Sequence, residues 1–192
     1  MINSHYKYFL LNKPYGVLSQ FTDKDDRLTL SSIYNFPKSI YPVGRLDLDS
    51  EGILLLTNDK SLTDYLLNPK KKHEREYYVQ VESIPTKEAL QKLRQGIELK
   101  DGKTLPAKVK IIDDPKFPDR VPPIRERKNI PATWISITLT EGKNRQVRRM
   151  TAAAGYPTLR LVRVRIKNLM VGELKSGEFR ELKEEEIKKL VK

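Results

Sequence analysis

The sequence predicts an α+β fold, because stretches typical of strands and stretches typical of helices occur along one chain. Residues 53–56 form a continuous apolar run, which indicates a strand buried on both faces. Residues 133–139 and 161–167 alternate between two kinds of side chain, as strands with one buried face do. Elsewhere, apolar residues recur at helical spacing directly after residues that commonly cap the N-terminus of a helix. We therefore expect a single domain over residues 1–192.

The order of the elements follows from turn and capping residues. Strands are expected at residues 8–11, 17–21, 53–56, 77–81, 133–139 and 161–167. Three helices are expected to begin at Asn58 or Asp59, at Thr86 and at Asn144, and to end before Pro69, at Gly96 and at Gly155. A fourth helix is expected in residues 182–192, where Ile187 and Leu190 stand at helical spacing. The proline-rich residues 115–131 predict a long loop, and loops of this length are often functional.

The chain is strongly basic, with a formal net charge of +12 and a sequence pI of about 9.7. Such an excess indicates a polyanionic partner such as nucleic acid, although a basic protein without such a partner would have the same composition. The excess is concentrated in residues 141–167, where eight Lys and Arg residues stand against one Glu. A concentrated basic block indicates nucleic-acid binding better than a diffuse excess does.

Several classes of site and location are excluded by composition. The absence of cysteine excludes disulfides, thiolate catalysis and cysteine-bound zinc. The two histidines, His5 and His73, do not stand at a metal-ligand spacing, so we expect no metal site. Residues 1–7 lack the apolar core of a signal peptide, and no apolar run approaches the ~20 residues that span a bilayer. We therefore expect a cytoplasmic protein that does not associate with membranes. We also expect it to be a monomer.

The most informative segment is Gly44-Arg45-Leu46-Asp47, which continues through residues 48–59 as LDSEGILLLTND. It places the carboxylate of Asp47 in a polar turn directly ahead of the buried strand. A carboxylate held beside such a strand can act as a nucleophile if it stays ionised. Asp is also common in turns because its side chain bonds nearby backbone N–H groups, so turn chemistry alone favours a turn or cap residue.

This segment resembles the catalytic motif of pseudouridine synthases of the RsuA family, which reads G-R-L-D, then S-E-G, an aliphatic run and T-N-D. The match has no gap, and the resemblance implies that Asp47 is the nucleophile, acting on C6 of uracil or on C1′ of the ribose. Residues 8–16 resemble the start of the family's catalytic domain with its N-K-P-x-G, so we expect no S4-type RNA-binding domain ahead of it. The resemblance further implies a mixed, mainly antiparallel sheet in two lobes, with flanking helices and a central cleft.

A second motif lies in residues 141–150, EGKNRQVRRM, which resemble a family motif whose Arg two residues after Gln pairs with the catalytic Asp. Arg148 occupies that position, and its guanidinium would keep Asp47 ionised. The alternative is that Arg145, Arg148 and Arg149 only contact phosphates.

A third motif lies in residues 75–79, REYYV, which resemble the family's basic-x-Tyr-x-Val segment. The resemblance implies that Tyr77 stacks on the target base and assists proton removal from C5. Neighbouring residues of a strand face opposite ways, so Tyr78 is expected to be a core tyrosine.

The residues expected to contact RNA surround these motifs or belong to the proline-rich loop and the basic strand. They are Arg45, Arg125, Arg127, Lys128, Lys143, Asn144, Arg145, Gln146, Arg149, Arg163 and Arg165. In residues 161–167, the apolar side chains are expected to face the core, and Arg163, Arg165 and Lys167 the solvent as a basic surface. Lys143 stands where relatives often have Arg, which keeps the charge but loses bidentate geometry.

The resemblance implies an RNA pseudouridine synthase that detaches uracil at N1, reattaches it at C5, and needs neither cofactor nor metal. Residues 122–131 look most like the RluE branch of the family, which acts on 23S ribosomal RNA. The target uridine would be flipped out of its stem. The alternatives are a non-catalytic ribosomal RNA-binding or ribosome assembly factor and a DNA-binding regulator. A pure binder gains nothing from a carboxylate among phosphates, and no helix-turn-helix or zinc module is evident in the sequence.

Overall fold

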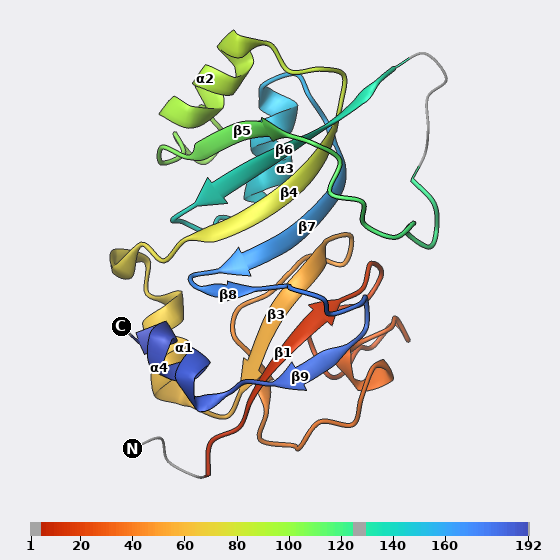
Figure 1. Cartoon of the computed structure of the whole chain (residues 1–192), viewed down its shortest axis with the longest axis vertical. Coiled ribbons are helices and arrows are strands. Elements are labelled where there is room, and N and C mark those ends of the chain that lie inside the picture. The colour runs from red at the N-terminus through yellow and green to blue at the C-terminus, as the bar shows by residue number, and fades with distance from the viewer. Residues whose placement is uncertain (1–4, 125–129, 192) are drawn as a thin grey trace. The chain divides into compact units, whose positions relative to one another are not determined.

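The chain folds into two compact units (Figure 1). The structure, a computed structural model, describes residues 5–124 and 130–191. Unit 1 comprises Met1–His73 and Arg163–Lys192, and unit 2 comprises Glu74–Val162. Strand β7 (Thr158–Ile166) runs from unit 2 into unit 1. Each unit combines antiparallel strands with α-helices, so the expected α+β class is confirmed.

Unit 1 is built on the antiparallel pair of β1 (Tyr8–Lys13) and β3 (Glu51–Thr57). Both strands are longer than the residues 8–11 and 53–56 that the sequence predicted. Strand β9 (Phe179–Glu181) extends it beside β1, and β2 (Tyr41–Pro42) pairs with β3. Strand β8 (Leu169–Met170) pairs with the end of β7. The unit's helices are α1 (Lys60–Leu67) and α4 (Glu184–Val191), with short 3₁₀ turns η1 (Leu30–Ser32) and η2 (Pro69–Lys71).

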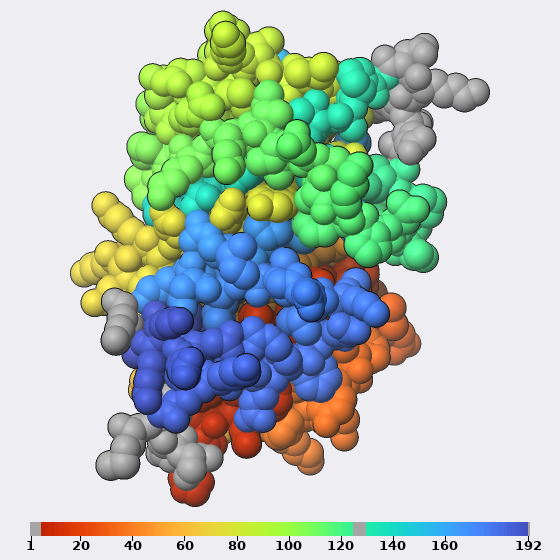
Figure 2. Space-filling model, viewed as in Figure 1, coloured from red at the N-terminus to blue at the C-terminus, as the bar shows by residue number. Residues whose placement is uncertain are grey.

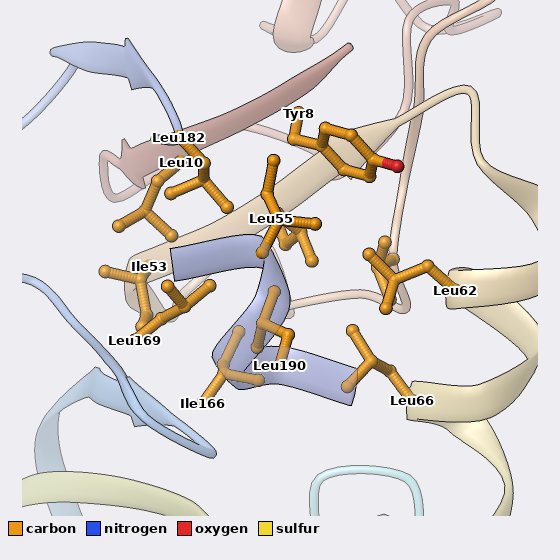
Figure 3. Packing of buried hydrophobic residues seen from close by; sticks show 12 residues of the cluster. Tyr8, Leu10, Ile53, Leu55, Leu62, Leu66, Ile166, Leu169, Leu182 and Leu190 are labelled. Atoms are coloured by element: carbon orange, nitrogen blue, oxygen red, sulfur yellow. The ribbon is translucent and has the colours of Figure 1, made fainter. Parts of the chain in front are cut away.

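Both faces of β3 are covered, as its continuous apolar run predicts. On one face, Leu55 points into a cluster that includes Leu66 of α1 and Leu190 of α4 (Figure 3). On the other face, Leu54 packs in a separate cluster that includes Phe36. All seven residues of β3 are buried. The strand is therefore a rigid support for the loop that precedes it.

Unit 2 is a sheet with helices against one face. Strand β6 (Ala132–Leu139) pairs with β4 (Arg75–Glu82) and with β5 (Lys108–Ile112). Side chains of α2 (Lys87–Gln95) and α3 (Gln146–Ala153) join one hydrophobic cluster with Val79, Val81 and Ile135 of the strands. The opposite face of β4 and β6 carries their alternate residues, because successive side chains of a strand point to opposite faces.

The capping predictions hold for two helices. The side chain of Asp59 accepts a hydrogen bond from the Leu62 N–H at 2.9 Å, and α1 begins after it. The side chain of Thr86 accepts one from the Ala89 N–H at 3.2 Å, and α2 ends at Gly96 with φ +86°. No helix in residues 5–124 and 130–191 is long and apolar enough to cross a membrane.

Three expectations about elements are wrong. Residues 17–21 form no strand, and only an isolated parallel bridge joins Leu18 to Thr29. Asn144 does not cap α3, which begins after Arg145 in a left-handed conformation (φ +47°). Strand β7 does not present a basic face to solvent at Arg163, whose side chain is buried. Within residues 115–124, 130 and 131 the expected irregular loop is confirmed.

Candidate active site

The loop between β2 and β3 carries Asp47, and buried hydrogen bonds fix its backbone. The Ser19 Oγ accepts a hydrogen bond from the Leu46 N–H at 3.0 Å and donates one to the Leu46 carbonyl at 2.8 Å. The Gly16 N–H donates to the Leu48 carbonyl at 2.8 Å. Ser19 and Leu46 are buried, so water does not compete for the two bonds between them. The backbone is thus held on both sides of Asp47.

The two glycines of the motif have distinct structural reasons. Gly44 has φ +73°, and a methyl group there would lie 3.1 Å from the Leu67 Cδ2. Gly52 has φ +105°, and a methyl group there would overlap the backbone of Arg163. A side chain at Gly52 would therefore push β7 away from the start of β3. The motif's second glycine permits a close approach of two backbones beside the Asp47 loop.

A fully buried lysine ties down the turn that follows β1. The Lys13 Nζ donates hydrogen bonds to the Pro14 carbonyl at 2.8 Å and to the Val17 carbonyl at 2.7 Å. None of the Lys13 side chain is exposed to solvent. These bonds fix the segment that leads to Ser19. Because Ser19 in turn holds the Asp47 loop, Lys13 stabilises that loop indirectly.

Lys13 is also the positive centre of a charged group in unit 1. Burial lowers the pKa of Lys13 to about 8. The charges of Glu51, Asp49 and Asp47 act in the opposite direction, and Arg163 acts with burial. Three carboxylates therefore lie near a desolvated ammonium group, which offsets part of their mutual repulsion.

In the part of the chain that the structure describes, no group of three His, Cys, Asp or Glu side chains could hold a metal ion.

Arg163 is a structural group within unit 1, which corrects the expectation of an outward-facing arginine. Its side chain is 4% exposed, and its Nε donates a hydrogen bond to the Ile53 carbonyl at 2.8 Å. Arg165 is half-buried, and its Nη1 donates to the Lys167 carbonyl at 2.7 Å. The alternation along β7 correctly predicted which side chains share a face, but the face that carries Arg163 is buried at that residue instead of exposed to solvent.

In unit 2, the loop before α3 is locked by Gln146. The Gln146 Nε2 donates to the Glu141 Oε1 at 2.6 Å, and its Oε1 accepts from the Lys143 N–H at 2.9 Å. The same Glu141 oxygen accepts from the Leu105 N–H at 2.7 Å. Gln146 is only 4% exposed, so the amide stabilises the loop rather than lying on the surface as expected of an RNA contact.

Two of the motif's cations bind the turn at residues 101–103. The Lys143 Nζ lies 3.3–3.4 Å from the carbonyl oxygens of Asp101, Gly102 and Lys103. The Arg149 guanidinium makes a bidentate pair with Asp101 at 2.7 and 3.1 Å, and this pair lowers the pKa of Asp101. A phosphate would have to share these cations with the turn.

The two neighbouring tyrosines lie on opposite faces of β4, as expected. Tyr77 is half-buried and packs against the cluster shared with α2 and α3. Tyr78 lies half-buried on the other face, with its ring centroid 6.2 Å from that of Phe117, so the expectation that Tyr78 is the core tyrosine is wrong. Arg148 is a half-buried residue of α3. The meeting of Asp47 with Tyr77 and Arg148 stays a prediction.

The residues predicted to contact RNA fall into four groups. Arg45, Asn144 and Arg145 are exposed to solvent. Arg163 and Gln146 are buried, while the remaining described ones are half-buried: Lys143, Arg149 and Arg165. Three predicted contacts lie outside the described residues: Arg125, Arg127 and Lys128. Contact with RNA stays a prediction for all of them.

Sequence reasoning missed two residues that support the site. Lys13 stands within the recognised N-K-P-x-G segment, but nothing in the local pattern shows that its ammonium group is buried near carboxylates. Ser19 carries no motif signal at all, because its partner Leu46 is 27 residues away.

Comparison with known proteins defines the family. Residues 7–153 match the family model described as RNA pseudouridylate synthase. The chain therefore belongs to the RNA pseudouridylate synthase family, and it is an RNA pseudouridine synthase. This membership favours an enzyme over the alternatives of a non-catalytic RNA-binding factor and a DNA-binding regulator.

The relatives refine the comparison. The chain is 53% identical over 176 residues to the ribosomal large subunit pseudouridine synthase E of Vibrio parahaemolyticus, covering 92% of this chain and 74% of the relative. It is 41% identical over 184 residues to the ribosomal large subunit pseudouridine synthase B of Bacillus subtilis, covering 95% of this chain and 70% of the relative. A crystal structure of a pseudouridylate synthase matches with a TM-score of 0.81 at 30% identity, covering 99% of this chain and 76% of that one.

Proposed function

We propose that this chain isomerises one specific uridine of 23S ribosomal RNA to pseudouridine, with Asp47 as the nucleophile. Its similarity to enzymes named large subunit pseudouridine synthase E and B supports the choice of substrate. The observation that carries the role of Asp47 is the clamped loop, in which Ser19 and Gly16 hold the backbone on both sides. A reacting group needs such a fixed position, because small displacements are costly in rate.

The reaction exchanges one bond of uracil for another. The bond from N1 to C1′ breaks, a bond from C5 to C1′ forms, the C5 proton leaves, and N1 gains a proton. The ionised Asp47 adds to C6 of uracil or to C1′ of the ribose and is released unchanged. Both routes leave atoms and electrons balanced within the substrate, so the overall reaction is an isomerisation.

Tyr77 and Arg148 complete the proposed catalytic group. Arg148 pairs with Asp47 and keeps its carboxylate charged. Tyr77 stacks on the detached uracil, and its hydroxyl assists the removal of the C5 proton. The target nucleotide is flipped out of its stem so that the base reaches these side chains.

The basic residues around the motifs supply affinity for the RNA backbone. Arg45 and Arg145 are exposed on the loops that precede β3 and α3, where they can contact phosphates. Binding should therefore weaken steeply as salt rises. We propose that the protein acts as a monomer, in the cytoplasm where ribosomal RNA is found.

The proposal is tested by mapping pseudouridines in ribosomal RNA from cells with and without this protein. One position of 23S ribosomal RNA should lose its modification, and the purified protein should restore it on a transcript of that region. An identical modification pattern in both cells would reject the proposed substrate.

A further inference from the structure

Unit 2 contains a cavity that lies outside the catalytic motifs. Its volume is about 590 Å³, within the range of ~300–1,000 Å³ that is typical of small-molecule pockets. Its floor is the face of the sheet opposite the helices, where Gln80 of β4 stands beside Trp134 of β6 in the strand register. Its wall is the loop from Asp114 to Ile124, which runs over the surface of unit 2 (green in Figures 1 and 2).

The wall of the cavity is pinned to its floor by aromatic and cationic contacts. The Phe117 ring meets Trp134 edge-on, with centroids 5.7 Å apart. The Arg160 guanidinium lies 5.5 Å from the Phe117 centroid, and its Nη1 donates to the Pro118 carbonyl at 2.9 Å. These contacts hold the loop at its middle, so the cavity has a preformed aromatic side.

The polar groups of the cavity are mainly hydrogen-bond acceptors. The Gln80 Oε1 is buried and accepts no hydrogen bond from the residues that the structure describes. The carboxylates of Glu82, Asp114 and Asp119 also line the cavity. Arg120 directs its Nε and Nη2 to the Pro122 and Pro123 carbonyls at 2.9 and 3.2 Å. A flat ligand with adjacent N–H donors would fit this cavity, because its donors would bond the acceptors while its ring packs against the aromatic side chain.

Among the acceptors, Gln80 and Glu82 are the pair best placed to act together. They are alternate residues of β4, so their side chains project from the same face of the sheet. Asp114 is engaged by Lys116, whose backbone N–H and Nζ donate to its two oxygens at 2.9 and 3.2 Å. A carboxylate such as Glu82 has several acceptor positions and can bond a ligand while keeping a protein partner.

We propose that this cavity binds the guanine base of an unpaired nucleotide in the substrate RNA. Guanine alone among the RNA bases presents two adjacent donors on its pairing edge, N1–H and the exocyclic amino group. Glu82 accepts both of these donors or shares them with the Gln80 Oε1, and the ring lies against Phe117. A phosphate is disfavoured because three carboxylates line the cavity of an otherwise basic protein. The choice of an RNA base over a cationic peptide side chain rests on the proposed RNA substrate.

The test uses Trp134, the only tryptophan in the chain, as a reporter within the cavity. Guanosine 5′-monophosphate should change its fluorescence with a saturable curve, measured with correction for absorption by the nucleotide. Inosine 5′-monophosphate, which lacks the exocyclic amino group, should bind about tenfold more weakly or worse, because one of two hydrogen bonds is lost. Uridine 5′-monophosphate should bind more weakly still.

Matched variants separate the cavity from the rest of the surface. Glu82→Gln and Gln80→Leu should each weaken the binding of guanosine 5′-monophosphate by about tenfold. Glu98→Gln makes the same change as Glu82→Gln at an exposed position of unit 2 and should have no effect. Unfolding curves of all three variants show that each is folded.

Three outcomes would overturn the proposal. They are the absence of a saturable change with guanosine 5′-monophosphate, equal binding by Glu82→Gln and Glu98→Gln, and tighter binding of argininamide than of guanosine 5′-monophosphate, which would assign the cavity to a peptide. Turnover of the RNA is measured separately. Guanosine binding without pseudouridine formation would reject only the proposed function, and normal turnover without guanosine binding would reject only the cavity.

Discussion

Replacing Ser19 with alanine tests the clamp on the Asp47 loop. The substitution removes the acceptor of the Leu46 N–H and the donor to the Leu46 carbonyl, and both groups are buried. A buried group left without its partner costs about 1–3 kcal/mol, so the two together should lower the free energy of unfolding by about 2–6 kcal/mol. For a protein of this size, each kcal/mol corresponds to roughly 2–4 °C in Tm, so Ser19→Ala should melt about 4–24 °C lower.

The same change should reduce catalysis. A loop that has lost its clamp holds the Asp47 carboxylate less well, and a displacement of ~1 Å can cost about a hundredfold in rate. We expect the rate constant for pseudouridine formation to fall by about tenfold to a hundredfold, measured under single-turnover conditions at a temperature where the variant is folded.

The matched control is Ser31→Ala. The exposed Ser31 hydroxyl donates one hydrogen bond to the Phe21 carbonyl at 2.7 Å, and water can replace it. Its loss should cost about 0.5 kcal/mol or less. If Ser19→Ala is no less stable than Ser31→Ala and turns over at the native rate, the clamp does not position Asp47.

Three further predictions concern charge, close packing and the paired tyrosines. Burial lowers the pKa of Lys13 from 10.5 to about 8, so between these pH values the unfolded chain binds more protons than the folded one, and the free energy of unfolding rises with pH. Lys13→Met should remove about 2–3 kcal/mol of that rise between pH 8 and 10, as measured by urea titration. Gly52→Ala should cost about 2–4 kcal/mol from overlap and strain, whereas Gly172→Ala, where a methyl meets nothing within 4 Å, should cost about 1 kcal/mol; equal losses would reject the close approach. Tyr77→Phe should bind RNA but stall turnover, Tyr78→Phe should be mild, and the reverse order would show that Tyr78 serves the reaction.

Local patterns predicted the elements whose causes are local. The apolar run at residues 53–56 predicted a strand buried on both faces, and separate clusters cover the two faces of β3. Asp59 and Thr86 predicted helix starts because each needs only an N–H group three residues away. Asn144 failed as a cap because the helix begins one residue later than expected: the chain enters α3 through Arg145 in a left-handed conformation, and the Gln146 N–H bonds to the Lys143 carbonyl at 3.2 Å.

Long-range contacts account for what the sequence did not predict. Alternation in β7 showed which residues share a face, but Arg163 is buried by its bond to the carbonyl of Ile53, 110 residues away. The bonds between Ser19 and Leu46 have the same character. The motif placed Asp47 correctly on the loop ahead of β3, whereas the groups that support it became apparent only in the folded chain.

The role of Asp47 is tested most directly by Asp47→Asn, which keeps the shape of the side chain and removes its charge. Pseudouridine formation and RNA affinity are measured together on a ribosomal RNA fragment that contains the target uridine. We expect no detectable turnover and RNA binding as tight as, or tighter than, that of the native protein, because a carboxylate that repels phosphates is gone. Turnover by Asp47→Asn at close to the native rate would contradict the assignment of Asp47 as the nucleophile.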